Sequence, residues 1–95
     1  MARITTKICG LNFDIIERTR NSRDDDNMGK CDPKELKIFI DDGLPQDQET
    51  LTLIHEWLHA VLCTYAIDHT EILVNAIAVE LFRSKFNIQL THSDL

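Results

Sequence analysis

Two histidines four residues apart, with a glutamate beside the first, are the residues in this sequence best suited to chemistry. They lie in His55-Glu56-Trp57-Leu58-His59, the pattern His-Glu-x-x-His. On a helix, side chains four residues apart share one face, so both imidazoles can reach one ion at the roughly 2.0–2.1 Å of a Zn–N bond. Glu56 points to the side of the pair, where it can contact a metal-held water without binding the metal. The pattern predicts zinc on His55 and His59, with Glu56 as general base.

A site with three protein ligands needs one more donor, and we expect Glu71 to supply it. Glu71 follows His59 by twelve residues and begins a second predicted helix, from which it can face the histidine pair across a short turn. Asn75, one turn further on, can hold one ligating imidazole through its amide. Asp68-x-x-Glu71 also fits a helix N-terminal cap that needs no metal. The alternative third ligands are, in order, Glu80, Asp68 and His69.

Residue type and spacing exclude two other arrangements. A metzincin would need Gly at position 62 and His at position 65, where this chain has Leu62 and Tyr65. Cys63 continues the four-residue series from His59, but three donors along one straight helix span about 12 Å and cannot converge on one ion. We therefore expect Cys63 to pack rather than to bind metal. The candidates for an additional oxyanion donor, each with an ordinary structural alternative, are Tyr65, His69 and His92.

The elements that must position these residues follow from hydrophobic spacing. Alternating residues predict a β-hairpin over residues 1–18, then a polar loop over 19–34 and a third strand over 35–41. Apolar residues at steps of three and four predict a helix over 45–66, which carries the two histidines, and a second over 69–87, before a tail over 88–95. The residues predicted to be buried on the two helices are Leu51, Ile54, Leu58, Val61, Leu62 and Tyr65, then Leu73, Val74, Ile77, Ala78, Leu81 and Phe82. The expected architecture is α+β, a single domain with an N-terminal three-stranded antiparallel sheet packed on two helices.

Length and charge restrict the functions open to the chain. Its 95 residues, 43% hydrophobic and 27% charged, suffice for one small domain with a thin core. Ten basic and sixteen acidic residues give a formal charge of -6, which argues against nucleic acid or an anionic membrane as the partner. No window approaches the roughly 20 apolar residues of a membrane span, and the N-terminus lacks the apolar stretch of a secretory signal. The three cysteines form no CxxC pair, so we expect a cytoplasmic protein.

The segments around the histidines resemble a known family. His55-Glu56-x-x-His59-Ala60 and Glu71-x-x-Val74-Asn75-Ala76-x-Ala78-x-Glu80-Leu81 are similar to segments of ImmA/IrrE-like metallopeptidases, in the gluzincin group. The layout is also similar to that of very short metallopeptidase-like proteins often encoded by phages and prophages, on the segments Gly29-Lys30-Cys31, Ile38-Phe39-Ile40 and Thr52-Leu53-Ile54-His55-Glu56. The resemblance covers residues 29–86. Leu73 departs from it, because the family pattern has a second acid there.

This resemblance implies a minimal zincin-like fold with zinc on His55, His59 and Glu71, and Asn75 near the ligating histidines. It implies a zinc-dependent metallopeptidase of the host cytoplasm that hydrolyses a protein or peptide through a zinc-bound water activated by Glu56. From chain order alone, we expect strand 35–41 to be a sheet edge that holds an extended peptide by main-chain hydrogen bonds. The alternatives are a non-catalytic zinc-stabilised module that binds a host or phage protein, and a small α+β domain without metal.

Overall fold

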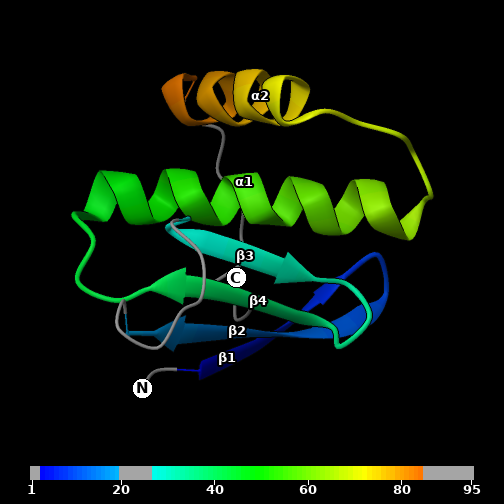
Figure 1. Cartoon of the computed structure of the whole chain (residues 1–95), viewed down its shortest axis with the longest axis horizontal. Coiled ribbons are helices and arrows are strands. Elements are labelled where there is room, and N and C mark those ends of the chain that lie inside the picture. The colour runs from blue at the N-terminus through cyan, green and yellow to red at the C-terminus, as the bar shows by residue number, and fades with distance from the viewer. Residues whose placement is uncertain (1–2, 20–26, 85–95) are drawn as a thin grey trace.

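The computed structural model describes residues 3–19 and 27–84, which form a four-stranded sheet and two helices in three layers (Figure 1). The strands are β1 (Arg3–Ile8), β2 (Leu11–Arg18), β3 (Gly29–Asp32) and β4 (Lys37–Asp41), and the helices are α1 (Gln46–Thr64) and α2 (Glu71–Arg83). Helix α1 lies between the sheet and α2 (Figure 1). The fold is therefore α+β, as expected.

The sheet differs from the predicted three-stranded antiparallel one, because it has four strands and mixed pairing. The strand order is β1-β2-β4-β3, with β2 and β4 parallel and the two outer pairs antiparallel. The extra strand, β3, lies inside residues 19–34, which were predicted to be a loop. Its four residues carry one glycine and two charged side chains and are followed by Pro33, so they show no alternating apolar pattern. Strand β3 runs antiparallel to β4 and so brings the chain back to the point where β4 begins, from which β4 runs parallel to β2.

Strand β4 corresponds to the predicted third strand, but the prediction that this strand lies at the sheet edge is wrong. It pairs with β2 on one side and with β3 on the other. Ile38 and Ile40 are buried under α1, as befits the centre of a sheet covered on that face. The edge that lies nearest to α1 is β3 (Figure 1).

Two local features fix the strands that lead to β3. The β1–β2 hairpin turns through Cys9 and Gly10, whose φ angles of 54° and 80° are those of a two-residue type I′ turn. Arg18, at the end of β2, donates from Nε to Asp41 Oδ1 at 3.0 Å and from Nη2 to the Asn27 carbonyl at 2.9 Å. Both charged side chains are almost fully buried, so the pair ties the end of β4 to the approach to β3.

Helix α1 is buried on two sides because it separates two hydrophobic cores. The core toward the sheet consists of Ile8, Phe13, Ile15, Ile38, Ile40 and Ala60. The core toward α2 consists of Ile54, Leu58, Val74 and Ala78. Three residues predicted to be buried are exposed: Tyr65 is 63% exposed, Leu73 45% and Ile77 37%. Five others are half-buried, namely Leu51, Val61, Leu62, Leu81 and Phe82. In the described part of the chain α2 packs mainly on α1, so one narrow stripe of α2 is covered and its flanks face solvent.

The turn between the helices contains two capping motifs, one at the end of α1 and one at the start of α2. Ala66, at φ 54°, is the left-handed residue of a Schellman motif, in which the Ala66 and Ile67 amides donate to the carbonyls of Cys63 and Leu62. Thr70 caps α2, because its hydroxyl accepts from the Leu73 amide at 3.1 Å. The predicted helices over 45–66 and 69–87 are therefore shorter at both ends where the chain is described, and residues 85–95, with the predicted tail, lie outside it. Neither described helix is long and apolar enough to cross a membrane.

Candidate metal centre

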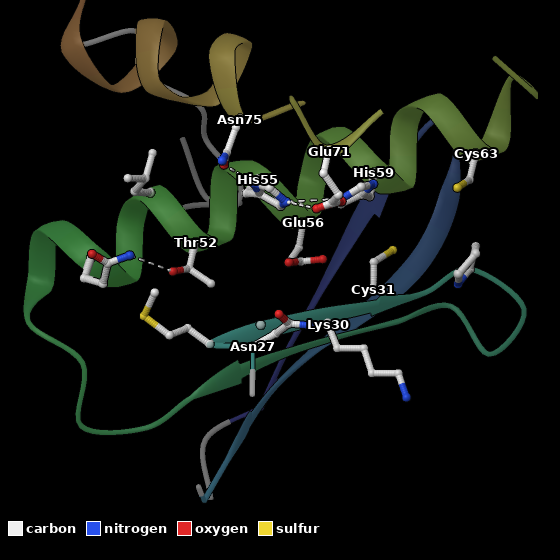
Figure 2. A pocket seen from close by; sticks show the side chains of 15 residues that line it. Asn27, Lys30, Cys31, Thr52, His55, Glu56, His59, Cys63, Glu71 and Asn75 are labelled. Atoms are coloured by element: carbon white, nitrogen blue, oxygen red, sulfur yellow. Dashed lines mark hydrogen bonds and ion pairs between the residues drawn. The ribbon is translucent and has the colours of Figure 1, made fainter. Parts of the chain in front are cut away.

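Three predicted ligand side chains converge at one point between α1 and α2. His55 Nε2 lies 3.2 Å from His59 Nε2 and 3.2 Å from Glu71 Oε2, while His59 Nε2 lies 2.5 Å from Glu71 Oε1. Within residues 3–19 and 27–84, this is the group whose ligand atoms all fall within 4.8 Å of one another. Figure 2 shows Glu71 reaching from α2 to the two imidazoles on α1. The arrangement can hold a metal ion.

The donor set fits zinc. Two imidazole nitrogens and one carboxylate are a known three-ligand set for this ion, and tetrahedral bonds of about 2.0–2.1 Å place ligand atoms roughly 3.3 Å apart. The distance between the two Nε2 atoms, 3.2 Å, matches that spacing, whereas the Glu71 oxygens each contact a different imidazole, Oε2 at 3.2 Å from His55 and Oε1 at 2.5 Å from His59. The Glu71 side chain is 68% exposed, so it is free to move outward by the fraction of an ångström required.

Both imidazoles are held from behind by a second contact. His55 Nδ1 lies 3.0 Å from Asn75 Oδ1, and His59 Nδ1 lies 3.0 Å from His69 Nε2. When Nε2 of a histidine binds metal, its proton resides on Nδ1, so each Nδ1–H donates to the neighbour behind it. Asn75 therefore makes the contact with a histidine that its spacing predicted. The contact from His69 was not predicted, because His69 was considered only as a ligand or an oxyanion donor.

The electrostatics of the site favour a metal over a reactive thiol. Burial lowers the pKa of His59, an effect that the Glu71 carboxylate opposes and the neighbouring His55 reinforces. The imidazole is thus neutral at neutral pH, with a lone pair available for a metal. On strand β3, burial and the nearby charge of Glu56 raise the pKa of the Cys31 thiol to about 12. That thiol stays protonated, which argues against a role as nucleophile or thiolate ligand.

Glu56 lies in a cleft beside the histidines. The cleft has a volume of about 610 Å³ and runs between α1 and the residues around β3, with Glu71 and Asn75 at its α2 side. Glu56 is 7% exposed and points from α1 toward β3 (Figure 2). Glu56 is not part of the group formed by His55, His59 and Glu71, so its carboxylate is not among the atoms that could hold a metal.

The closeness of β3 to α1 depends on Gly29, whose role the sequence did not reveal. A Cβ at this position would lie 2.7 Å from Thr52 Cγ2 and 3.1 Å from Glu56 Cγ. Any larger residue would therefore push the strand away from the helix or displace the Glu56 side chain. A glycine in a polar segment ordinarily indicates a turn, so only the packing identifies this one as a close contact.

The other candidate residues lie elsewhere. Glu80 pairs with Arg83 at 3.9 Å on the exposed side of α2, and Asp68 is exposed and does not cap the helix, since Thr70 does. His69 lies behind the His59 ring, on the side away from Glu71. Cys63, which was expected to pack, is exposed and lines the cleft. His92 lies outside the described residues.

Comparison with protein-family models, with curated proteins and with solved structures finds no match to this chain. The geometry of the site is therefore the basis for assigning a function.

Proposed function

We propose that this protein is a zinc-dependent metallopeptidase, in which His55, His59 and Glu71 hold the metal and Glu56 is the general base. The observation that carries the proposal is the convergence of two Nε2 atoms and one carboxylate at the wall of an open cleft. Three protein ligands are the number found in catalytic zinc sites, whereas structural sites use four. We also propose that the protein is related to the ImmA/IrrE-like metallopeptidases. The contacts of Glu71 and Asn75 with His55 support this relationship, because both residues come from the segment that resembles the family.

Each residue of the site has a distinct role in the proposed hydrolysis. Zinc, when bound, supplies a Lewis acid that polarises a carbonyl and lowers the pKa of a water toward about 7. Glu56 takes a proton from the attacking water on its carboxylate and passes it to the departing amine. Asn75 holds the His55 ring in orientation, and His69 holds the His59 ring. The buried position of Glu56 keeps its carboxylate directed into the cleft.

The edge of β3 is suited to hold an extended peptide substrate. The Met28 carbonyl accepts from the Asp41 amide, so along β3 the main-chain groups alternate between facing β4 and facing outward. By this alternation Gly29 and Cys31 direct their N–H and C=O groups away from β4, and both residues line the cleft. A peptide strand added there would run past Glu56 and the histidines. The substrate we propose is therefore a protein or peptide in extended conformation.

A second candidate is a zinc-stabilised binding module without catalysis. It is favoured by one observation, that the ligand group joins α2, through Glu71, to the two histidines of α1. Because α2 packs mainly on α1, a metal there would fasten the outer helix to the domain. The two candidates agree on the metal and disagree on Glu56.

The first experiment measures metal in protein purified without a histidine tag. We expect about one equivalent of zinc in the wild type, loss of this zinc in Glu71→Gln, and retention in Glu80→Gln, a matched acid on the same helix. A wild type with less than about a tenth of an equivalent after incubation with zinc would reject both candidates.

The second experiment measures cleavage of an unfolded protein substrate. Glu56→Gln should lower the rate by about 10²–10⁴-fold with zinc content unchanged, whereas Glu49→Gln, an exposed acid of α1, should have no effect. Stoichiometric zinc with no cleavage by any variant, and equal stability of Glu56→Gln and wild type, would favour the binding module instead.

A further inference from the structure

His69 lies in the turn between the two helices, behind the metal-facing side of His59. Its Nε2 atom is 3.0 Å from His59 Nδ1, and its own Nδ1 atom is 2.8 Å from the carbonyl oxygen of Ile67. The His59 and His69 rings lie with centroids 5.1 Å apart at an interplanar angle of 49°. His69 is half-buried, and it makes both contacts at ordinary hydrogen-bond length.

These contacts permit only one arrangement of ring protons once a metal is bound. His59 Nε2 faces Glu71 and must be unprotonated to act as a ligand, so its proton is on Nδ1. That N–H donates to His69 Nε2, which must then carry no proton. His69 is protonated on Nδ1 instead, and this N–H donates to the Ile67 carbonyl, which can only accept. Every donor and acceptor in the series is satisfied.

The backbone on each side of His69 is fixed by a helix end. Before it, the Ile67 amide donates to the Leu62 carbonyl at 2.9 Å, which closes the Schellman motif of α1. After it, the Thr70 hydroxyl caps α2 through the Leu73 amide. Because the Ile67 carbonyl and the His69 backbone are both held in this way, the His69 ring has a defined position relative to α1. A ring so placed restricts rotation of His59 about its side-chain bonds.

We propose that His69 is a positioning residue that sets the metal affinity of this site by holding His59 in one tautomer and orientation. This inference rests on the proposed metal centre. His69 is not itself a ligand, because it contacts Nδ1 of His59 while Glu71 and His55 contact Nε2, on the other side of the ring. It does for His59 what Asn75 does for His55. Partners of this kind affect metal affinity by about 10–100-fold.

The test is a zinc affinity measured by competition with a chelating indicator. His69→Leu removes the acceptor and should weaken zinc binding by about 10–100-fold. His69→Gln places an amide oxygen close to the position of Nε2, so it should restore most of the affinity. Asp68→Asn, an exposed neighbour in the same turn, should match the wild type. A role limited to folding would instead be seen as equal losses in the Leu and Gln variants, in step with the stability of the metal-free protein.

Two spectroscopic measurements complete the test. The visible spectrum of the cobalt-loaded protein should keep its shape in His69→Leu, because all three ligands remain, whereas loss of a ligand would change it. In the zinc-loaded wild type, nitrogen NMR should show the proton of both His59 and His69 on Nδ1. This second measurement needs no variant and so does not depend on whether His69→Leu folds.

The outcomes separate this inference from the proposed function. Zinc affinity in His69→Leu equal to wild type, no recovery in His69→Gln, an altered cobalt spectrum, or a proton on His69 Nε2 would each overturn the role of His69. The metal centre would stand if wild type still bound zinc and Glu71→Gln did not. Absence of zinc binding in the wild type would overturn both.

Discussion

Replacing Gly29 with alanine should destabilise the protein by forcing β3 away from α1. The added Cβ would lie 2.7 Å from Thr52 Cγ2, about 0.7 Å short of ordinary contact at 3.4 Å, and 3.2 Å from the Phe39 carbonyl oxygen. Overpacking of this kind costs about 1–3 kcal/mol. Alanine restricts the unfolded chain more than glycine does, which offsets about 0.5–1 kcal/mol of that cost. We therefore expect a net loss centred a little above 1 kcal/mol and at most about 2.5 kcal/mol, at roughly 4–8 °C in Tm per kcal/mol for a domain of this size.

A compensating change at Thr52 tests whether contact with the Thr52 methyl group causes the loss of stability. Thr52→Ser removes the Cγ2 methyl and keeps the hydroxyl, so it should recover about 1 kcal/mol in the Gly29→Ala background although it destabilises the wild type slightly. The control is Gly10→Ala, because no atom lies within 4 Å of a Cβ at Gly10 and its φ of 80° gives the strain another origin. Thr52→Ser should not rescue that variant.

The assay is guanidinium unfolding of metal-free protein, so that metal binding does not contribute to the measured free energy. A Gly29→Ala variant as stable as the wild type would refute the predicted clash. Equal changes in unfolding free energy on adding Thr52→Ser to the wild type and to the Gly29→Ala variant would refute it as well. Recovery of both glycine variants by Thr52→Ser would likewise contradict a local clash between β3 and α1.

The left-handed residue in the turn between the helices and the buried imidazole of His59 both affect stability. Ala66→Gly should stabilise the protein by about 0.5–1 kcal/mol in thermal unfolding, because φ is 54° at this position and glycine adopts such an angle without strain. The control Ala76→Gly, within α2, should destabilise the protein by about 1 kcal/mol. Changes in unfolding free energy of the same sign in both variants would contradict the Schellman motif. Because the pKa of His59 is lowered by burial, the unfolded state binds a proton first as pH falls, so metal-free protein should lose stability as pH drops below 6.5. His59→Gln should remove this contribution, and an unchanged slope of unfolding free energy against pH would refute it.

The sequence was sufficient for the parts of this protein that depend on local geometry. The recurrence of apolar residues at steps of three and four predicted α1 and α2, and the repeat of the α-helix placed His55 and His59 on one face. Glu71 and Asn75 could be selected because donors one turn apart at the start of a following helix can face the pair. The fit of two imidazoles and one carboxylate to zinc is likewise a matter of residue type.

The sequence was insufficient where pairing or packing between distant segments decides the outcome. β3 has too few apolar residues to be recognised, and only its pairing with β4 makes it a strand and moves β4 to the interior. Leu73 and Ile77 fit the apolar stripe of α2 but remain partly exposed, because in the described structure no further layer covers that helix. Likewise, no spacing rule connects His59 with His69 across an irregular turn.

The two helices and the chemical identity of the candidate ligands could be read from the amino-acid sequence, since both depend on interactions within a few turns of chain. The tertiary structure alone decided which strand forms the wall of the cleft, how closely Gly29 lets that wall approach Glu56, and which group holds the back of each imidazole. The physical reason is that strand order and side-chain contacts between distant residues minimise the free energy of the whole chain, and no local segment contains that information.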